Sequence, residues 1–134
     1  MEYVLDASVA LAWCLPDEEF DDAQTALEAL RHGSATAPSI WIYEVVSGLR
    51  TAIRRGRIES SAVTEVLAML KALPIEVVAY PVAESLLDFA ERFDLSVYDA
   101  AYLDLADARG LPLATRDERL RSAALAAGVE VLAA

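Results

Sequence analysis

The sequence contains few of the side chains that several kinds of chemistry require. Cys14 is its single cysteine and His32 its single histidine. One cysteine excludes an internal disulfide and puts a thiolate metal site out of reach, so we expect Cys14 to pack in the core. His32 lies at the predicted end of an acidic helix, which argues against a nucleophilic triad built around a histidine.

Long apolar runs are also absent. No run approaches the ~18 residues of a membrane span, although 56% of the residues are hydrophobic. The start, Met1-Glu2-Tyr3, lacks the positively charged region of a signal peptide. We therefore expect a cytoplasmic protein with no membrane contact. We also expect a single domain over residues 1–134, a length that buries roughly two-thirds of the unfolded surface.

Positive charge is scarce as well. The chain has 11 Lys and Arg residues against 22 Asp and Glu, which gives a net charge of −11. This balance argues against a protein that binds nucleic acid through a generally basic surface. Acids crowd the first turns of a helix predicted over residues 17–31, Asp22 among them, and we assign these acids to the helix dipole and to solubility.

The basic residues are unevenly distributed. Nine acids and a single arginine precede residue 50, whereas Arg50, Arg54, Arg55 and Arg57 then follow without an intervening acid. We call these four residues the arginine cluster. They have two interpretations, because arginines at a helix end complement its dipole and arginines also contact backbone phosphates.

Short apolar segments alternate with helical patterns along the chain. Apolar residues at steps of three and four indicate the helices, and Gly or Pro ends several of them. We predict strands at 2–5, 35–37, 75–78 and 111–114, a final apolar run at 129–132, and helices at 8–15, 17–31, 39–55, 59–73, 82–92, 96–109 and up to 127. The alternation predicts an α/β fold with a parallel sheet covered on both faces.

The helix predicted over 39–55 is the most apolar of these. We place its core face at Ile42, Val45, Val46 and Leu49. Glu44 lies within the same segment, where an ionised carboxylate needs a partner unless it turns outward to solvent.

Three aspartates stand near the ends of predicted strands. Asp6 follows the first strand, Asp117 follows the fourth, and Asp99 lies on the helix that leads into the fourth. Open parallel sheets bind their ligands beyond the carboxyl ends of the strands, so these side chains have a reason to meet. Together with Glu44 we call them the four site acids.

The aspartates also have structural interpretations. Asp99 fits a capping box that begins at Ser96, and Glu118 fits another that begins at Thr115. Asp6 could cap the helix that follows it. Taken one at a time, each of these acids is better explained by a structural role such as a helix cap than by a role as a ligand.

Taken together, the four site acids favour a metal site. Carboxylates are natural ligands of Mg²⁺ and Mn²⁺, and catalysis with these ions needs one or two carboxylates per ion with open positions for water and phosphate. The aspartates would supply these ligands, and Glu44 could complete the set or orient water. Ser8 and Thr115 lie one or two residues from an aspartate and could donate hydrogen bonds to the carboxylates.

Several segments, in this order and spacing, resemble a known family. They are Val4 to Ser8, Pro38 with Tyr43-Glu44-Val45 and Gly48-Leu49, Leu95 to Ala100 with Tyr102-Leu103, and Ala114 to Asp117 with Leu120. The chain resembles the PIN-domain ribonucleases over nearly its whole length, and among them the short VapC-type toxins of prokaryotic toxin–antitoxin pairs.

The resemblance implies a three-layer α/β/α sandwich around a short parallel sheet. It implies Mg²⁺ or Mn²⁺ held by Asp6, Asp99 and Asp117 with Glu44, and endonucleolytic cleavage of RNA. It also implies a homodimer and inhibition by a small cognate antitoxin. Asp104 and Asp107 match no position of the family pattern, and we expect both to be surface acids.

Other classes share some of these features. An aspartyl-phosphate receiver domain would have the size and the acidic Mg²⁺ site, but it needs an acidic pair after the first strand and a lysine after the last, whereas Lys71 lies in a predicted helix. A haloacid-dehalogenase-type phosphatase needs an aspartate in place of Ser8. A non-catalytic RNA- or partner-binding module could keep the fold but would not need all four site acids.

Two further expectations follow for the site. An acidic chain needs cations to hold RNA, and the candidates are Arg50, Arg54, Arg55 and Arg116, which would contact backbone phosphates. If the four site acids share one pocket, repulsion between like charges should raise the pKa of at least one of them above about 4 in the metal-free fold.

Overall fold

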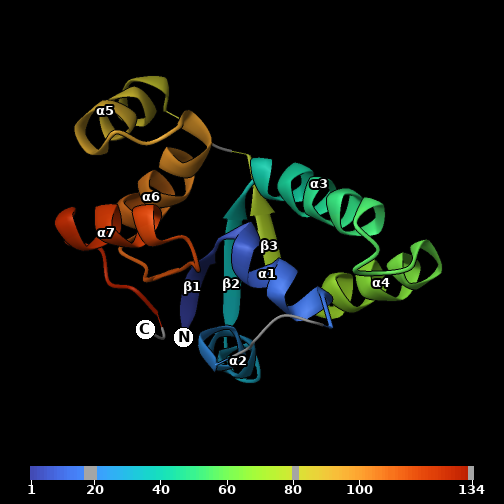
Figure 1. The fold of residues 1–134 in the computed structure, drawn as a ribbon. Helices are drawn as coiled ribbons and strands as arrows, with labels where there is room; N and C mark the ends of the chain where they lie inside the picture. The colour runs from blue at the N-terminus through green and yellow to red at the C-terminus, as the bar shows by residue number, and fades with distance from the viewer. Residues whose placement is uncertain (17–20, 80–81, 133–134) are drawn as a thin grey trace.

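The centre of the protein is a parallel sheet of four short strands (Figure 1). The computed structural model describes residues 1–16, 21–79 and 82–132. The strands are β1 (Glu2–Leu5), β2 (Ser34–Pro38), β3 (Ile75–Val78) and β4 (Leu113–Ala114), in the order β3-β2-β1-β4. All three pairings are parallel. The predicted α/β fold class is confirmed.

Helices cover both faces of this sheet, as β1 illustrates. Tyr3, Val4 and Leu5 are all completely buried. Successive side chains of a strand point to opposite faces, so full burial of three in a row requires cover on both sides. The Tyr3 hydroxyl donates a hydrogen bond of 2.6 Å to the carbonyl of Ala26, which attaches the second helix to one of these faces.

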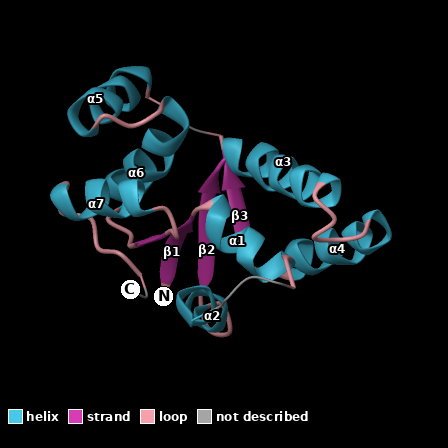
Figure 2. Cartoon of the chain, in the orientation of Figure 1, coloured by secondary structure: helices cyan, strands magenta, loops and turns pink. Residues whose placement is uncertain are grey.

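The helices form two groups (Figures 1 and 2). Their bounds are α1 (Ala7–Cys14), α2 (Asp21–Ala29), α3 (Ile40–Arg54), α4 (Val63–Ala72), α5 (Ala83–Phe93), α6 (Val97–Arg109) and α7 (Glu118–Ala126), with a 3-10 turn at Ser60–Ala62 before α4. Helix α1 packs against α2 and α3, whereas α6 packs against α5, α7 and the strands β1 and β2. The predicted start of α2 at residue 17 lies outside the described residues.

The predictions for Cys14 and for the final apolar run are confirmed. Cys14 is buried in the core. The final apolar run pairs with the sheet through a parallel bridge between Leu113 and Val131. Within the described part of the chain, no helix has the length and apolar character needed to cross a bilayer.

The predicted core face of α3 is wrong in part. Val45 and Leu49 are buried, but Ile42 is 47% exposed and Val46 is 50% exposed. Helix α3 packs on α1 and the sheet through a narrower stripe than the sequence suggests. Ile42 and Val46 instead line a groove between α3, α4 and β3, and this groove also contains the 39% exposed Val77.

The expectation of a surface acid at Asp104 is also wrong. Asp104 is 1% exposed, and its Oδ1 accepts a hydrogen bond of 2.7 Å from the Ser85 hydroxyl. The cause is the packing of α5 on α6, which covers the face of α6 that carries Asp104 and supplies a donor for its carboxylate. Asp107 is exposed, as expected.

Candidate active site

The candidate site lies at the carboxyl ends of β1 and β4. The chain leaves β1 towards β2 and β3 on one side and later returns to β4 on the other side of β1. Such a reversal of strand order opens a crevice beyond the strand ends. Asp6 comes directly after β1, and its backbone N–H donates a 3.0 Å hydrogen bond to the carbonyl of Ala114 at the end of β4.

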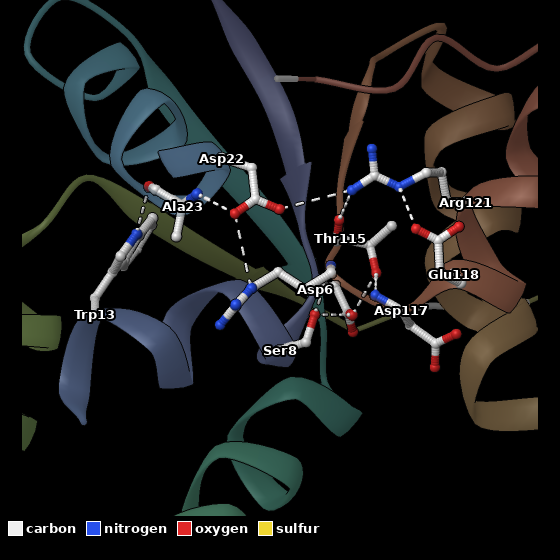
Figure 3. Close-up of polar contacts among 10 residues, drawn as sticks. Asp6, Ser8, Trp13, Asp22, Ala23, Thr115, Asp117, Glu118 and Arg121 are labelled. Atoms are coloured by element: carbon white, nitrogen blue, oxygen red, sulfur yellow. Dashed lines mark hydrogen bonds and ion pairs between the residues drawn. The ribbon is translucent and has the colours of Figure 1, made fainter. Parts of the chain in front are cut away.

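Two hydroxyl groups hold the Asp6 side chain (Figure 3). Its Oδ2 accepts hydrogen bonds from Ser8 Oγ at 2.6 Å and from Thr115 Oγ1 at 2.8 Å. Asp6 occupies the N-cap position of α1, but its side chain makes no capping hydrogen bond. The local cap interpretation is therefore wrong for Asp6, and the expected contacts from Ser8 and Thr115 are present.

Asp117 begins α7 and does act as a helix cap. Its Oδ1 accepts hydrogen bonds from the backbone N–H groups of Arg119 at 2.9 Å and Leu120 at 3.1 Å. Its own N–H donates to Thr115 Oγ1 at 3.0 Å. The cap is thus Asp117 itself, and the capping box predicted between Thr115 and Glu118 is wrong by two residues because α7 begins later.

Glu44 projects from α3 towards α6. Its Oε1 accepts a hydrogen bond of 2.5 Å from the hydroxyl of Tyr102, a completely buried residue of α6. The sequence indicated that Glu44 needs a partner, but it did not identify Tyr102. Tyr102 lies three positions after Asp99, so one face of α6 supplies both a site acid and the donor that holds another.

Asp99 lies in the first turn of α6. Its backbone N–H donates a 3.1 Å hydrogen bond to Ser96 Oγ, which confirms Ser96 as the cap of this helix. The Ser96 hydroxyl also interacts with the Asp99 carboxylate and lowers its pKa, which partly opposes the effect of burial.

The pKa values of Asp6, Glu44 and Asp99 are raised, and neighbouring site acids contribute to each rise. Burial raises the pKa of Asp6 to about 6, and the charges of Glu44 and Asp99 add to this effect, while the hydrogen bonds from Ser8 and Thr115 oppose it. Burial also raises the pKa of Glu44, with a further contribution from Asp99. These shifts have the sign expected of carboxylates that share a partly dehydrated pocket.

Asp99 links this group to the β4 side of the site. Burial raises its pKa, the charge of Asp117 raises it further, and Arg119 opposes the rise. Each site acid therefore interacts electrostatically with at least one other, although they come from four different segments of the chain.

The donor chemistry of the site fits Mg²⁺ or Mn²⁺. Within residues 1–16, 21–79 and 82–132, no three Asp, Glu, His or Cys side chains are grouped so that they could hold a metal ion. Mg²⁺ keeps several waters and uses only one or two protein carboxylates, so a site for this ion does not need three such side chains. Asp6, with hydroxyl groups on one oxygen, and the half-buried Asp99 supply hard oxygen donors of the required kind.

The loop that carries Thr115 is also attached to α2 (Figure 3). Asp22 lies between two arginines, with its Oδ1 3.7 Å from Arg116 Nε and its Oδ2 3.7 Å from a terminal nitrogen of Arg121. Arg121 also donates a 3.1 Å hydrogen bond to the carbonyl of Thr115. The assignment of Asp22 to the helix dipole and to solubility did not include these two ion pairs, because the packing of α2 beside this loop is a tertiary contact that the local sequence does not show.

The fold and the site together define a class of protein. The chain belongs to the PIN domain family, whose pattern matches residues 3–125. It is 31% identical to Ribonuclease VapC3 of Pyrobaculum aerophilum over 90% of this chain and 92% of that protein. It is 35% identical to VapC ribonuclease Mb0985 of Mycobacterium bovis over 87% of each chain.

Solved structures have the same fold. The crystal structure of PAE2754 from Pyrobaculum aerophilum superposes with a TM-score of 0.73 at 25% identity, over 92% of this chain and 84% of that one. The structure of VapBC2 from Rickettsia felis, bound to a DNA fragment from their promoter, superposes with a TM-score of 0.71 at 12% identity. That likeness covers 98% of this chain and 97% of the other, and it concerns the fold alone.

Proposed function

We propose that this protein is a metal-dependent endoribonuclease that serves as the toxin of a toxin–antitoxin pair. The observation that carries the proposal is the meeting of Asp6 with Thr115 at the crevice between β1 and β4 in a chain of the PIN domain family. The curated relatives with 31% and 35% identity are named as VapC ribonucleases, which supports RNA as the substrate.

In this proposal the four site acids hold Mg²⁺ or Mn²⁺. A bound ion of this kind supplies positive charge opposite the phosphate and activates water for attack on it.

The neighbouring side chains keep the carboxylates in place. Ser8 and Thr115 direct Oδ2 of Asp6 and support its ionised form, since a hydrogen bond to a carboxylate favours that form. Tyr102 does the same for Glu44. Such outer contacts fix the orientation of metal ligands.

The proposed contacts to RNA come from arginines outside the acid group. Arg50, Arg54 and Arg55 are exposed at the end of α3, and Arg116 lies between Thr115 and Asp117. Arginine is well suited to this role because its guanidinium can form two parallel hydrogen bonds with a phosphate.

The proposed protein partners are a small cognate antitoxin and a second copy of this chain. The groove between α3, α4 and β3 supports a protein partner, because it exposes Ile42, Val46 and Val77 in one place. Contiguous exposed apolar surface is typical of such contacts. A cytoplasmic location and a single domain over residues 1–134 belong to the same proposal.

A cleavage assay tests the activity directly. Purified protein, freed of any inhibitor, should cut a structured RNA in the presence of Mn²⁺ or Mg²⁺, and excess EDTA should stop the reaction. Asp99→Asn should reduce the rate by more than about 100-fold, beyond the 10–100-fold typical of residues around a metal site. Asp107→Asn is the matched control, because Asp107 is an exposed acid on the same helix. Undiminished cleavage in EDTA would contradict the proposal.

A further inference from the structure

A second pocket adjoins the acidic site on the side of α1 and α3. Its volume is about 370 Å³, within the ~300–1,000 Å³ range typical of ligand pockets. Two arginines, Arg57 and Arg116, line it together with the hydroxyl-bearing residues Ser8, Ser47 and Thr51. We call this space the arginine pocket. Its polar lining is cationic and rich in hydroxyl groups, opposite in charge to the four site acids.

The close approach of α1 and α3 forms the floor of the arginine pocket. Gly48 on α3 faces Leu11 on α1, and a Cβ added at Gly48 would lie 2.4 Å from Leu11 Cδ1. Any side chain at position 48 would therefore displace the Leu11 side chain, which the glycine leaves in place. Both residues also line the pocket, so the packing of the two helices determines its depth.

The turn after α3 brings Arg57 back to the pocket. Gly56 has a φ of +70°, which places it in the left-handed region that glycine adopts readily. The N–H of Arg57 bonds to the carbonyl of Ala52 at 2.9 Å, and the N–H of Gly56 bonds to the carbonyl of Ile53 at 3.1 Å. These two hydrogen bonds form a Schellman motif, which reverses the chain at a helix end. The motif directs Arg57 towards α1, whereas Arg54 and Arg55 remain exposed.

Two residues belong to both the arginine pocket and the acidic site. Ser8 Oγ donates to Asp6 Oδ2 at 2.6 Å and accepts a 3.0 Å hydrogen bond from the backbone N–H of Arg116. Arg116 follows Thr115 and precedes Asp117 in the chain. Ser8 and Arg116 therefore connect the two sites directly, and an RNA strand that passes the site acids would also pass this pocket.

We infer that the arginine pocket binds a backbone phosphate of the RNA strand next to the phosphate that is cleaved. This inference rests on the proposed function. The Arg57 and Arg116 guanidinium groups and the Ser47 and Thr51 hydroxyl groups are donors suited to the acceptor oxygens of a phosphate group, and Asp22 holds Arg116 beside the pocket at 3.7 Å from its Nε. A chain with a net charge of −11 needs such a site close to its acids, because these acids repel the substrate. Arg57 is then an RNA-positioning residue; it belongs to the arginine cluster but was not among the four RNA contacts named from the sequence.

The pocket favours RNA over a protein partner. Ser8 and Arg116 join it to the acids that would act on RNA, whereas the exposed apolar residues lie along the groove between α3, α4 and β3. To bind a phosphate group, the pocket needs hydrogen-bond donors around the phosphate oxygens and no further complementarity of shape. Binding of an acidic segment of an antitoxin in the pocket is the contrary outcome of the test.

The experiment compares Arg57→Ala with Arg109→Ala, an exposed arginine at the end of α6 that lines neither site. The probe is a fluorescent oligoribonucleotide that the wild type cleaves in Mn²⁺. We expect Arg57→Ala to raise KM about 10-fold and leave kcat within about 2-fold, because the lost contact holds the strand away from the reacting atoms. Arg57→Lys should recover part of the loss, and Arg109→Ala should match the wild type.

Binding measurements separate this inference from the proposed function. In the inactive Asp99→Asn protein, adding Arg57→Ala should weaken RNA binding about 10-fold and reduce the salt slope by about one, as expected for one lost phosphate contact. If Arg57→Ala cleaves RNA with the same KM as the wild type and its RNA binding has the same salt slope, the inference is overturned and the proposed function stands. Loss of antitoxin affinity with unchanged RNA affinity would also overturn it. A wild type that neither binds nor cleaves RNA would overturn both proposals.

Discussion

The four site acids come from two regions that are built differently. Asp6 and Asp117 belong to the strand edge, where β1 and β4 end. Glu44 and Asp99 belong to the helix side, where α3 and α6 face each other across the site.

The strand edge is bound together by many hydrogen bonds. Thr115 Oγ1 donates to Asp6 Oδ2 and accepts from the N–H of Asp117, so one hydroxyl joins both acids of the edge. Arg121 holds the Thr115 carbonyl from behind. By contrast, among the described residues one side-chain hydrogen bond, from Tyr102 to Glu44, joins the two helices of the helix side. The position of the strand edge is therefore fixed by the sheet, whereas the position of the helix side depends on how α3 and α6 are placed.

The two regions should therefore respond differently to a change of protonation or a lost side chain. Burial of the carboxylate should cost the most stability at Asp6. Loss of a hydrogen-bond donor should weaken metal binding most at Glu44. Removal of one negative charge should raise the melting temperature at Asp99 but not at Asp117. The following predictions test these differences in order of decreasing size.

The largest expected effect is the pH dependence that Asp6 gives to the metal-free fold. Its pKa rises from an ordinary 3.8 to about 6 on folding, so the folded state binds more protons than the unfolded state between these values. The stability it contributes is fully present below pH 3.8 and is lost as the pH rises through about 6. At about 1.4 kcal/mol for each pKa unit, the cost at pH 7 is about 3 kcal/mol.

Urea unfolding in EDTA at pH 4 to 8 measures this cost as the difference between wild type and Asp6→Asn. The difference reports Asp6 together with its coupling to Glu44 and Asp99, because carboxylates that do not interact with Asp6 titrate alike in both proteins. We expect Asp6→Asn to gain stability relative to wild type as the pH rises, and added Mn²⁺ to reduce that gain by stabilising wild type. A difference that is constant with pH would show that the Asp6 carboxylate carries no burial penalty.

The next effect concerns the single bond of the helix side. Tyr102→Phe removes the donor to Glu44 while keeping the ring in the core, and we expect a 10–100-fold loss of Mn²⁺ affinity, the range typical of residues that orient a metal ligand. Calorimetric titration of Mn²⁺ measures it. Tyr98→Phe is the control, because Tyr98 lies on the same helix and is 59% exposed. Equal affinities in both variants would show that Glu44 needs no fixed orientation.

The strand edge was the more predictable of the two regions. The positions of Asp6 and Asp117 depend on where a short apolar run ends and a helix begins, which is local information. Parallel strands then bring their carboxyl ends to one edge, so the meeting of Asp6 and Thr115 follows from the fold class. The sequence could not show that Asp6 uses its carboxylate for hydroxyl contacts and Asp117 uses its carboxylate for a cap.

The helix side was less predictable because it depends on helix rotation. The apolar surroundings of Glu44 showed that it needs a partner, but several hydroxyl groups could have supplied one, and only the placement of α6 selects Tyr102. The same limit explains the errors at Ile42 and Asp104. A small rotation of α3 moves Ile42 from core to groove, and the packing of α5 on α6 buries Asp104, which reads as a surface acid in isolation.

The smallest expected effect compares Asp99, whose backbone amide is capped by Ser96, with Asp117, whose carboxylate caps α7. Asp99→Asn removes a charge that Asp117 repels and leaves the Ser96 cap intact, because the cap uses the Asp99 amide. In EDTA at pH 7 we expect its melting temperature to rise by about 1–3 °C, which corresponds to less than about 1 kcal/mol for a partly exposed pair of charges.

Asp117→Asn should leave the melting temperature unchanged or lower it. It relieves the same repulsion, but it also removes a negative charge from the first turn of α7, where the carboxylate accepts from two backbone N–H groups. An asparagine caps nearly as well as an aspartate, so the loss is the dipole interaction, about 0.3–1 kcal/mol, which cancels or exceeds the gain. Thermal melts of both variants in EDTA and in Mn²⁺ decide the matter. Similar increases for the two variants in EDTA would mean that repulsion outweighs the cap at Asp117, and decreases for both, with an unaltered response to Mn²⁺, would mean that these acids act as separate caps and share no pocket.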